Sequence, residues 1–555
     1  MRRFLTALVL ASLLVVAFPA TYAQRASDKS KKASASTTTQ RGVDTIAAAQ
    51  LRDYLTFVAS DEMEGRDTPS RGLDTTAKFL AMNLARWGFK PAGDNGTYLQ
   101  RIELRRDRAD TGQTKFELNG RALTTGTDFL PAGGSGTVSG SLVFAGTGWF
   151  IKSKEIDAYK DIDPTGKIAV VVGTPNQSPR GVSRAELGKP GEDFMNPSDY
   201  ARKKGAVGLI YIPDFQYLAN WQRIRQRLVE RGSTVVAKFQ TESTPPLPSI
   251  VISPEIANAL FAGERQTATN VFTASYGTSA PTPFVMSEQK KVTMSLASSV
   301  ETVPTQNVVA VWEGSDPLLK TEYVALGAHY DHVGSGCPPA GNDTICNGAD
   351  DDGSGTTAML GMAEALAKSP TRPKRSILFV WHCGEEKGLW GSRYFTEYPT
   401  VPLDKIVAQI NMDMIGRSKK VGDTNPRNNE LTGPDSIYLI GSTMMSTELG
   451  EIVNTVNKSY LNLTFDTRYD DPKDPNRFFY RSDHFNYARK GIPIIFFFDG
   501  VHEDYHRAGD TADKIDYEKM EKVTRTIYMT AWEIANRPAR LKVDKPLPSQ
   551  ITGSE

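Results

Sequence analysis

The 555-residue sequence is poor in cysteine, in histidine and in net charge. It has three cysteines and six histidines, and its 65 basic side chains almost balance 64 acidic ones. A formal charge of +1 gives no basic excess that would indicate a nucleic-acid partner. After residue 18 no apolar run is as long as a transmembrane helix, so no later membrane span is expected. Hydrophobic and charged contents of 39% and 23% are typical of a globular protein.

The N-terminus has the pattern of a targeting segment. Two arginines precede an apolar run from Phe4 to Phe18, and small residues follow as far as Ala23. This pattern predicts a secretory signal peptide over 1–23, with a short membrane anchor as the alternative. Residues 24–44, rich in Ser, Thr, Ala and Lys, predict a disordered linker. We therefore expect a secreted or periplasmic protein with no stable membrane insertion after signal cleavage.

The three cysteines lie in the C-terminal half. Cys337 and Cys346 flank an eight-residue loop that contains proline, glycine and asparagine. In an oxidising compartment this spacing favours a disulfide, and a zinc–thiolate site is the alternative. Cys383 ends an apolar run, and we interpret it as a small buried filler rather than a nucleophile.

The stretch ILFVWHCGEEKGLWGS (377–392) combines a strand with two acids. Its first five residues are apolar, which predicts a strand buried on both faces of a parallel sheet. Glu385 and Glu386 follow that run. Open α/β sheets bind their ligands at the carboxyl ends of strands. Two neighbouring carboxylates there can divide the work, one holding a metal and the other accepting a proton.

All six histidines lie after residue 328, in segments that also carry acids. Several of these segments follow apolar runs that predict strands. Ligands from several strand ends can meet at one edge of an α/β sheet, and imidazole together with carboxylate suits zinc. The segments are GAHYDHVG (327–334), NGADDDGSG (347–355), INMDMIG (410–416) and EDYHRAGDT (503–511).

In this order, the motifs resemble the co-catalytic di-zinc exopeptidases of the bacterial secreted leucine-aminopeptidase type. That family also includes glutamate carboxypeptidases and the non-catalytic transferrin receptors. The resemblance runs from about Leu51 to Tyr517 and is interrupted by one insertion. It implies an α/β fold with a mainly parallel central sheet flanked by helices, and an inserted β-rich protease-associated domain. The alternation of strands and helices in the C-terminal part predicts the same sheet.

The resemblance also implies two zinc ions per chain and the residues that hold them. One ion is expected on His329, Asp351 and Asp413. The other is expected on Asp351, Glu386 and His506, so that Asp351 bridges the two. The remaining histidines are expected to form hydrogen bonds near the site: His332, His382, His484 and His502.

Four further residues acquire expected roles from the resemblance. Glu385 is expected to act as the general base that takes a proton from water and passes it to the leaving amine. Tyr505 is expected to stabilise the oxyanion of the tetrahedral intermediate. Asp331 is expected to accept the second N–H of the His329 ring. Arg481 is expected to contact substrate.

The segment SDEMEGRDTPSRG (60–72) resembles an N-terminal signature of the same family. Its Glu64, Gly65 and Arg66 are expected to be structural, as a buried ion pair or as a loop anchor. A change of composition near Pro131, to Gly/Ser-rich sequence with alternating apolar residues, predicts where the inserted domain begins. The expected divisions are a peptidase domain over 45–130 and 300–540, a protease-associated domain over 131–299 and a loose tail over 541–555.

These features predict a zinc-dependent aminopeptidase that acts on peptides with a free N-terminus. Glu385 and Asp413 can supply a negative pocket for the α-amine. A carboxypeptidase of the same fold needs an arginine cluster for the carboxylate, and only Arg481 is suitably placed. A receptor-like binding protein should have lost metal ligands, yet suitable residue types occupy all five positions. A glutaminyl cyclase, which uses one zinc, is a further alternative.

Overall fold

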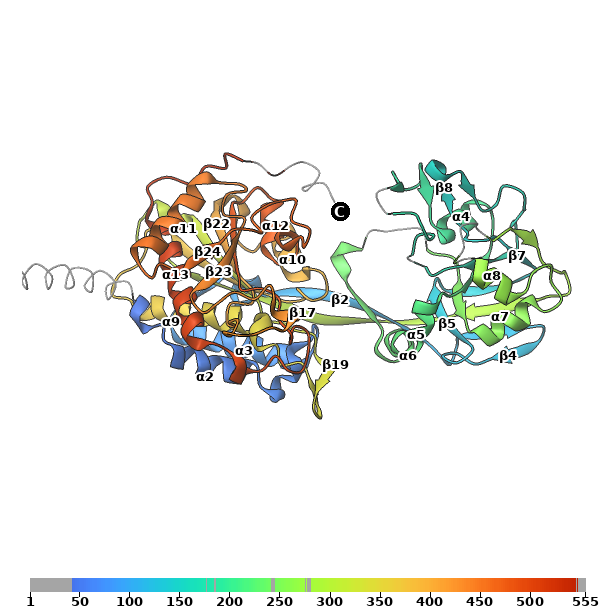
Figure 1. Ribbon diagram of the computed structural model, residues 1–555, viewed down its shortest axis with the longest axis horizontal. Coiled ribbons are helices and arrows are strands. Elements are labelled where there is room, and N and C mark those ends of the chain that lie inside the picture. The colour runs from blue at the N-terminus through green and yellow to red at the C-terminus, as the bar shows by residue number, and fades with distance from the viewer. Residues whose placement is uncertain are drawn as a thin grey trace, which may run out of the picture. The chain divides into compact units, whose positions relative to one another are not determined.

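The computed structural model describes residues 42–175, 177–183, 186–240, 245–274, 276, 281–545 and 547. The expected signal peptide (1–23), most of the expected linker (24–44) and most of the expected tail (541–555) lie outside these residues. The chain divides into two compact units, coloured by residue number in Figure 1. The first unit ends at Ile102 and resumes at Thr305, and the second unit spans Glu103–Pro304. Among the described residues, no helix has both the length and the apolar character needed to cross a membrane.

The first unit is built on a mixed sheet whose centre is parallel. β18 pairs in parallel with β21 and β22, and β22 pairs in parallel with β25. β17 runs antiparallel to β21, and β23 runs antiparallel to β25 but parallel to β24. The central strands are buried along nearly their whole length, as their continuous apolar runs predict. In spatial order the strands are β17 (Ser298–Trp312), β21 (Ser376–His382), β18 (Tyr323–His329), β22 (Ile406–Met412), β25 (Ile494–Phe498), β23 (Ser436–Ile440) and β24 (Thr464–Asp466).

Helices cover both faces of this sheet. Ala325 and Leu378 pack into a core that contains residues of α10 and α12. Their neighbours Leu326 and Ile377 face α9 and α13, because successive side chains of a strand point to opposite faces. This arrangement confirms the expected fold class. The helices of the first unit are α2 (Ala48–Val58), α3 (Arg71–Arg86), α9 (Gly355–Lys368), α10 (Trp390–Glu397), α11 (Thr447–Ser459), α12 (His484–Ala488) and α13 (Tyr517–Asn536).

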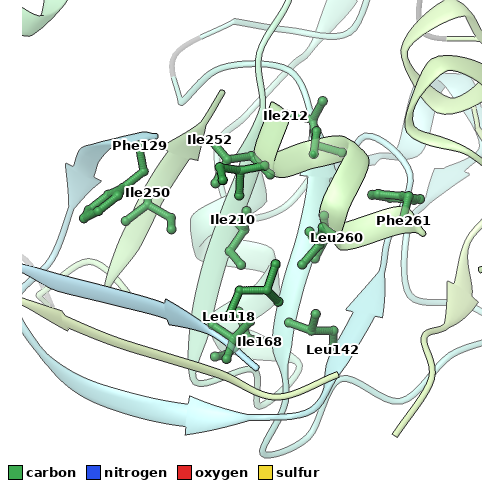
Figure 2. Packing of buried hydrophobic residues seen from close by; sticks show 14 of the residues in the cluster. Leu118, Phe129, Leu142, Ile168, Ile210, Ile212, Ile250, Ile252, Leu260 and Phe261 are labelled. Carbon is green, nitrogen blue, oxygen red and sulfur yellow. The ribbon is translucent and has the colours of Figure 1, made fainter. Parts of the chain in front are cut away.

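The second unit contains its own sheets and core. A six-stranded sheet has four parallel strands at its centre, and a four-stranded antiparallel sheet accompanies it. Figure 2 shows isoleucines of the central strands packed with Leu260 and Phe261 of α7 (Pro254–Phe261). In spatial order, the six-stranded sheet consists of β15 (Phe284–Val285), β7 (Leu142–Phe144), β10 (Ile168–Val172), β12 (Gly208–Ile212), β14 (Ser249–Ile252) and β5 (Phe129–Gly133). The four-stranded sheet consists of β4 (Arg121–Leu123), β3 (Lys115–Leu118), β16 (Val292–Leu296) and β6 (Gly136–Gly140).

The second unit begins earlier than the boundary expected at residue 131. Strands β3 and β4 form hydrogen-bonded ladders in the four-stranded sheet, and Phe116 and Leu118 are buried in the same core as Phe129. The change of composition near Pro131 therefore falls inside the unit. The chain passes from one unit to the other within β2 (Leu99–Ala109) and returns within β17.

Candidate metal centre

The predicted ligands stand at the ends of the central strands. His329 is the last residue of β18, and Asp413 directly follows β22. Glu386 lies in the loop after β21, Asp351 lies in the turn that leads into α9, and His506 lies in the loop after β25. Parallel strands bring these carboxyl ends to the same edge of the sheet, which is why distant segments of the sequence meet there.

His329, Asp351 and Asp413 form one group of possible ligands, and all three are buried. The Nε2 atom of His329 lies 3.3 Å from Oδ1 of Asp351 and 3.5 Å from Oδ1 of Asp413. The other oxygen of Asp351 faces a second group. One carboxylate thus contributes an oxygen to each group, as expected of a bridging ligand.

The second group contains Asp351, Glu386, His506 and also His332. His506 Nε2 lies 3.2 Å from Asp351 Oδ2 and 3.0 Å from Glu386 Oε2. His332 Nδ1 lies 2.8 Å from Glu386 Oε1 and 3.7 Å from Asp351 Oδ2. His332 was expected only to form hydrogen bonds near the site. Its position three residues after His329, in the sequence HYDH, is the signal from which a larger ligand set can be suspected.

The donor atoms of the second group fit a zinc ion. Asp351 Oδ2, Glu386 Oε1, His332 Nδ1 and His506 Nε2 are all buried and have no hydrogen-bond partner among the residues that the structure describes. Buried polar atoms without a partner are rare, and a cluster of them points to a group that binds them together. Two imidazoles and two carboxylates form a donor set that zinc accepts.

The two adjacent glutamates have opposite electrostatic surroundings. Burial raises the pKa of Glu385 well above its ordinary value, and the nearby carboxylates of Glu386 and Asp413 raise it further. Burial opposes ionisation of Glu386 as well, but the imidazoles of His332 and His506 outweigh it and lower the pKa of Glu386 to about 2. Neighbouring carboxyl groups with pKa values pushed apart are suited to different tasks.

The main-chain oxygen of Asp331, rather than its carboxylate as expected, lies closer to the His329 ring. His329 Nδ1 lies 3.2 Å from the main-chain oxygen of Asp331 and 3.7 Å from its carboxylate. The Asp331 carboxylate instead accepts a hydrogen bond of 3.2 Å from the backbone N–H of Glu385. The main chain therefore orients the His329 ring, because its carbonyl lies closer, while the Asp331 side chain positions the loop that carries the two glutamates.

Two further aspartates, which the sequence did not single out, hold the ligand-bearing loops. The Asp352 carboxylate accepts hydrogen bonds from the backbone N–H groups of His329 and Met414, at 3.2 Å each. The Asp510 carboxylate accepts from the backbone N–H groups of Asp350 and Asp351 at 3.0 and 3.1 Å. Adjacent acids thus do separate work: Asp351 faces the possible metals and Asp352 joins three segments of main chain.

Arg66 is a loop anchor, one of the two roles expected for it. Its guanidinium is fully buried and donates hydrogen bonds to the main-chain oxygens of Val58, Tyr330, Asn347 and Gly348, at 2.7 to 2.9 Å. The carboxylates around the site are not its hydrogen-bond partners. Arg66 therefore connects the loop of His329 to the loop of Asp351 through their backbones.

A pocket opens beside the possible metal ligands. Acidic side chains of Asp351, Glu385 and Asp413 form one wall. Arg481 lies over the ring of Phe478, with 5.1 Å between its guanidinium carbon and the ring centroid. The remaining lining residues are mainly apolar, with one tyrosine: Met414, Phe478, Phe496, Phe498, Val501 and Tyr505. The pocket lining therefore combines acidic groups with an apolar surface.

Tyr505 lines this pocket, and the three cysteines have the states expected for them. Tyr505 stacks on the His506 ring, with 3.9 Å between the centroids, and burial raises its pKa. Cys337 and Cys346 form a disulfide across the hairpin of β19 (Ser335–Ala340) and β20 (Asp343–Ile345), which leaves no role for them as zinc thiolates. Cys383 is buried, as interpreted from the sequence.

The three remaining histidines make polar contacts near the site, as expected. His382 Nε2 lies 3.0 Å from the Tyr487 hydroxyl. His484 Nε2 donates to the main-chain oxygen of Phe479 at 2.8 Å. His502 Nε2 lies 3.4 Å from the carboxylate of Asp350. None of these three belongs to either group of possible ligands among the described residues.

Residues 307–531 match the sequence model of Peptidase family M28. Leucine aminopeptidase 2 of Arthroderma otae is 28% identical over 272 residues, which cover 44% of this chain and 48% of that protein. Leupeptin-inactivating enzyme 1 of Streptomyces exfoliatus is 29% identical over 209 residues, covering 38% of each chain. The chain thus spans about half, or less, of the curated relatives it matches. Over residues 307–531 the chain is similar to this peptidase family, in agreement with the resemblance expected from the motifs.

Among solved structures, the aminopeptidase from Aneurinibacillus sp. strain AM-1 is similar with a TM-score of 0.50 and 17% identity. The similarity covers 92% of this chain and 98% of that one. At this level of identity the comparison supports the fold, and it agrees with the α/β architecture described above.

Proposed function

We propose that the protein is a secreted zinc-dependent aminopeptidase that uses two zinc ions to remove N-terminal residues from peptides. The observation that carries the proposal is the pair of ligand groups that share Asp351, with Glu385 beside them and outside both groups. His329 and Asp413 complete the first group. The relatives named as leucine aminopeptidases and the match to a peptidase family support the same conclusion.

When bound, zinc ions supply Lewis-acid chemistry, which polarises a peptide carbonyl and makes water more acidic. The chain's own residues supply the proton transfers. Glu385 takes a proton from water and delivers it to the leaving amine, because its carboxylate lines the pocket and lies 4.0 Å from the His329 ring. The Tyr505 hydroxyl, at the same pocket, stabilises negative charge on the carbonyl oxygen.

The pocket suits a free α-amine better than a carboxylate. Glu385 and Asp413 present negative charge where the peptide N-terminus would lie, and Arg481 is the one basic residue among the lining residues. A carboxypeptidase would need several cationic side chains to hold a terminal carboxylate. A receptor-like protein would not need two complete ligand groups with a base beside them.

We propose further that the second unit is an inserted protease-associated domain. Its separate compact core and its position between two parts of the peptidase sequence support this assignment. Export through the signal peptide is consistent with the Cys337–Cys346 disulfide, since disulfides persist in oxidising compartments.

The test combines a metal count with a panel of matched peptides. The purified protein should contain two zinc ions per chain, and exhaustive chelation should abolish hydrolysis. Each peptide is offered with a free N-terminus and with an acetylated one, and only the free form should be cleaved. Full activity after chelation would refute the metal mechanism. Equal rates on free and blocked peptides would refute the aminopeptidase assignment and favour a carboxypeptidase or an endopeptidase.

A further inference from the structure

His332 is a buried histidine beside the candidate metal ligands. Its side chain is fully buried, and within the described part of the chain neither Nδ1 nor Nε2 has a hydrogen-bond partner. Nδ1 nevertheless lies 2.8 Å from Glu386 Oε1, an oxygen that also has no hydrogen-bond partner. Burying an imidazole without a partner is costly. The ring therefore needs an interaction that the protein atoms alone do not provide.

We propose that His332 is a fourth protein ligand of the ion held by Asp351, Glu386 and His506, so that the two zinc sites are unequal. The inference rests on the proposed function, because it takes zinc to be the bound metal. The His332 site has four protein donors, whereas the site of His329 has three.

The spacing of the donor atoms supports coordination. Zinc binds imidazole and carboxylate at about 2.0–2.2 Å in a tetrahedron, which sets neighbouring donors roughly 3.3–3.5 Å apart. In the second group, Asp351 Oδ2 lies 3.2 Å from His506 Nε2 and 3.7 Å from His332 Nδ1. Glu386 lies 2.8 Å from His332 Nδ1 through Oε1 and 3.0 Å from His506 Nε2 through its other oxygen. All four donor atoms lie within 4.8 Å of one another. A hydrogen bond between His332 and Glu386 would account for one of these contacts and leave the other atoms without partners.

The protein fixes the His332 ring in this position. Its backbone N–H donates to the main-chain oxygen of Arg66 at 3.1 Å. Gly348 packs so closely against the ring that a Cβ atom there would lie 2.5 Å from His332 Cγ. The rings of His332 and His506 meet edge to face, with 5.5 Å between centroids. An imidazole packed on several sides has little freedom to turn away from the cluster.

The unequal sites divide the work of binding. Structural zinc sites are closed by four protein ligands, whereas catalytic sites keep a position open. The pocket is lined by Asp351, Glu385 and Asp413, and neither His332 nor Glu386 contributes to its lining. Apart from the shared Asp351, the three-donor site is thus the one with a ligand, Asp413, in the pocket lining. The four-donor site should hold its ion more tightly and anchor the loops that carry His506 and Glu386.

The first test measures zinc affinity by competition with a chelator. The wild-type protein should release its two ions in two steps, and His332→Asn should weaken the tighter step by at least about 10-fold, the lower end of what loss of a supporting group at a metal site costs. His502→Asn is the matched control, since its ring contacts Asp350 and belongs to neither group. Wild-type affinities in a folded His332→Asn protein would overturn the proposal.

Two further experiments test the proposal without measuring activity, and they remain decisive if His332→Asn does not fold. A cobalt-loaded His332→Cys protein should show a thiolate-to-cobalt charge-transfer band that the cobalt-loaded wild type lacks. A crystal structure of the zinc-loaded wild type should place His332 Nδ1 about 2.0–2.1 Å from zinc. Two bound zincs with His332 hydrogen-bonded to Glu386 instead would refute this inference alone. A protein that binds no zinc would refute the proposed function itself.

Discussion

Glu385→Gln and Glu386→Gln form a matched pair of perturbations. The residues are adjacent and the chemical change is the same, but their surroundings differ. The Glu386 oxygens lie 2.8 Å from His332 Nδ1 and 3.0 Å from His506 Nε2. Glu385 lies 4.0 Å from His329 Nε2 and lines the pocket. The structure therefore predicts loss of proton transfer from one substitution and loss of metal from the other.

Glu385→Gln should lower kcat by about 10²–10⁴, the usual effect of losing a general base. At about 1.4 kcal/mol per tenfold change, this corresponds to roughly 3–5.5 kcal/mol of transition-state stabilisation. Zinc content should stay at the wild-type value. Without zinc, the Glu385→Gln variant should have a melting temperature equal to or higher than that of the zinc-free wild-type protein. Burial and the carboxylates of Glu386 and Asp413 already disfavour a charge on Glu385, so a neutral amide relieves repulsion.

Glu386→Gln should act through the metal. It removes an anion that contacts two imidazoles, so zinc affinity at that site should fall by at least the 10- to 100-fold that loss of an outer partner costs. Activity should therefore depend on added zinc in Glu386→Gln, and excess zinc should recover part of it. Added zinc should recover nothing in Glu385→Gln, because its ions are already in place.

The assay is metal analysis of both purified variants, followed by kinetics over a range of zinc concentrations on an unblocked peptide. If Glu385→Gln loses zinc while Glu386→Gln keeps it, the two roles are exchanged and the alignment of the motif is wrong by one residue. If both variants keep wild-type kcat, neither glutamate is the base and the proposed mechanism fails.

Three further predictions concern stability. Arg66→Met should destabilise the protein by about 3–5 kcal/mol in urea denaturation, because four buried carbonyl groups lose their donor; a cost below about 1 kcal/mol would mean that they find other partners. In the zinc-free protein, the carboxylates of Asp351 and Glu386 outweigh burial and raise the pKa of His506 to about 10. The resulting stabilisation is complete below about pH 6.5 and is lost as the pH rises through about 10. Urea denaturation at a series of pH values should therefore show the free energy of unfolding of the zinc-free protein falling over this range. A free energy of unfolding that does not change with pH there would contradict the charge pairing. Cys337 and Cys346 should resist alkylation until reduced, and reduction should cost at most about 3 kcal/mol because the loop is short; rapid labelling without reductant would disprove the disulfide.

Much of the fold was predictable because its central strands are continuous apolar runs. The strand expected over the first five residues of 377–392 is β21 (Ser376–His382). Strands buried on both faces need no alternation of polar and apolar residues, so their sequences are distinctive. The boundary of the second unit was not predictable from composition, because β3 and β4 are short and half polar. Only their pairing with each other and of β3 with β16 assigns them to that unit.

The candidate site divides in the same way. The sequence determined which residues follow the strand ends, because a parallel sheet brings those ends to one edge whatever the loops do. The family resemblance selected His329, Asp351 and Asp413 among these residues, and the structure places the three within reach of one another.

The tertiary structure alone decided which supporting residues complete the site. His332 enters the second group because its loop is fixed by the backbone of Arg66, far away in sequence. Asp352 and Asp510 support the ligand loops through hydrogen bonds to main-chain N–H groups, which any residue carries and no pattern reveals. A side chain at a strand end is positioned by local geometry, but a side chain that closes a metal site is positioned by every loop packed around it.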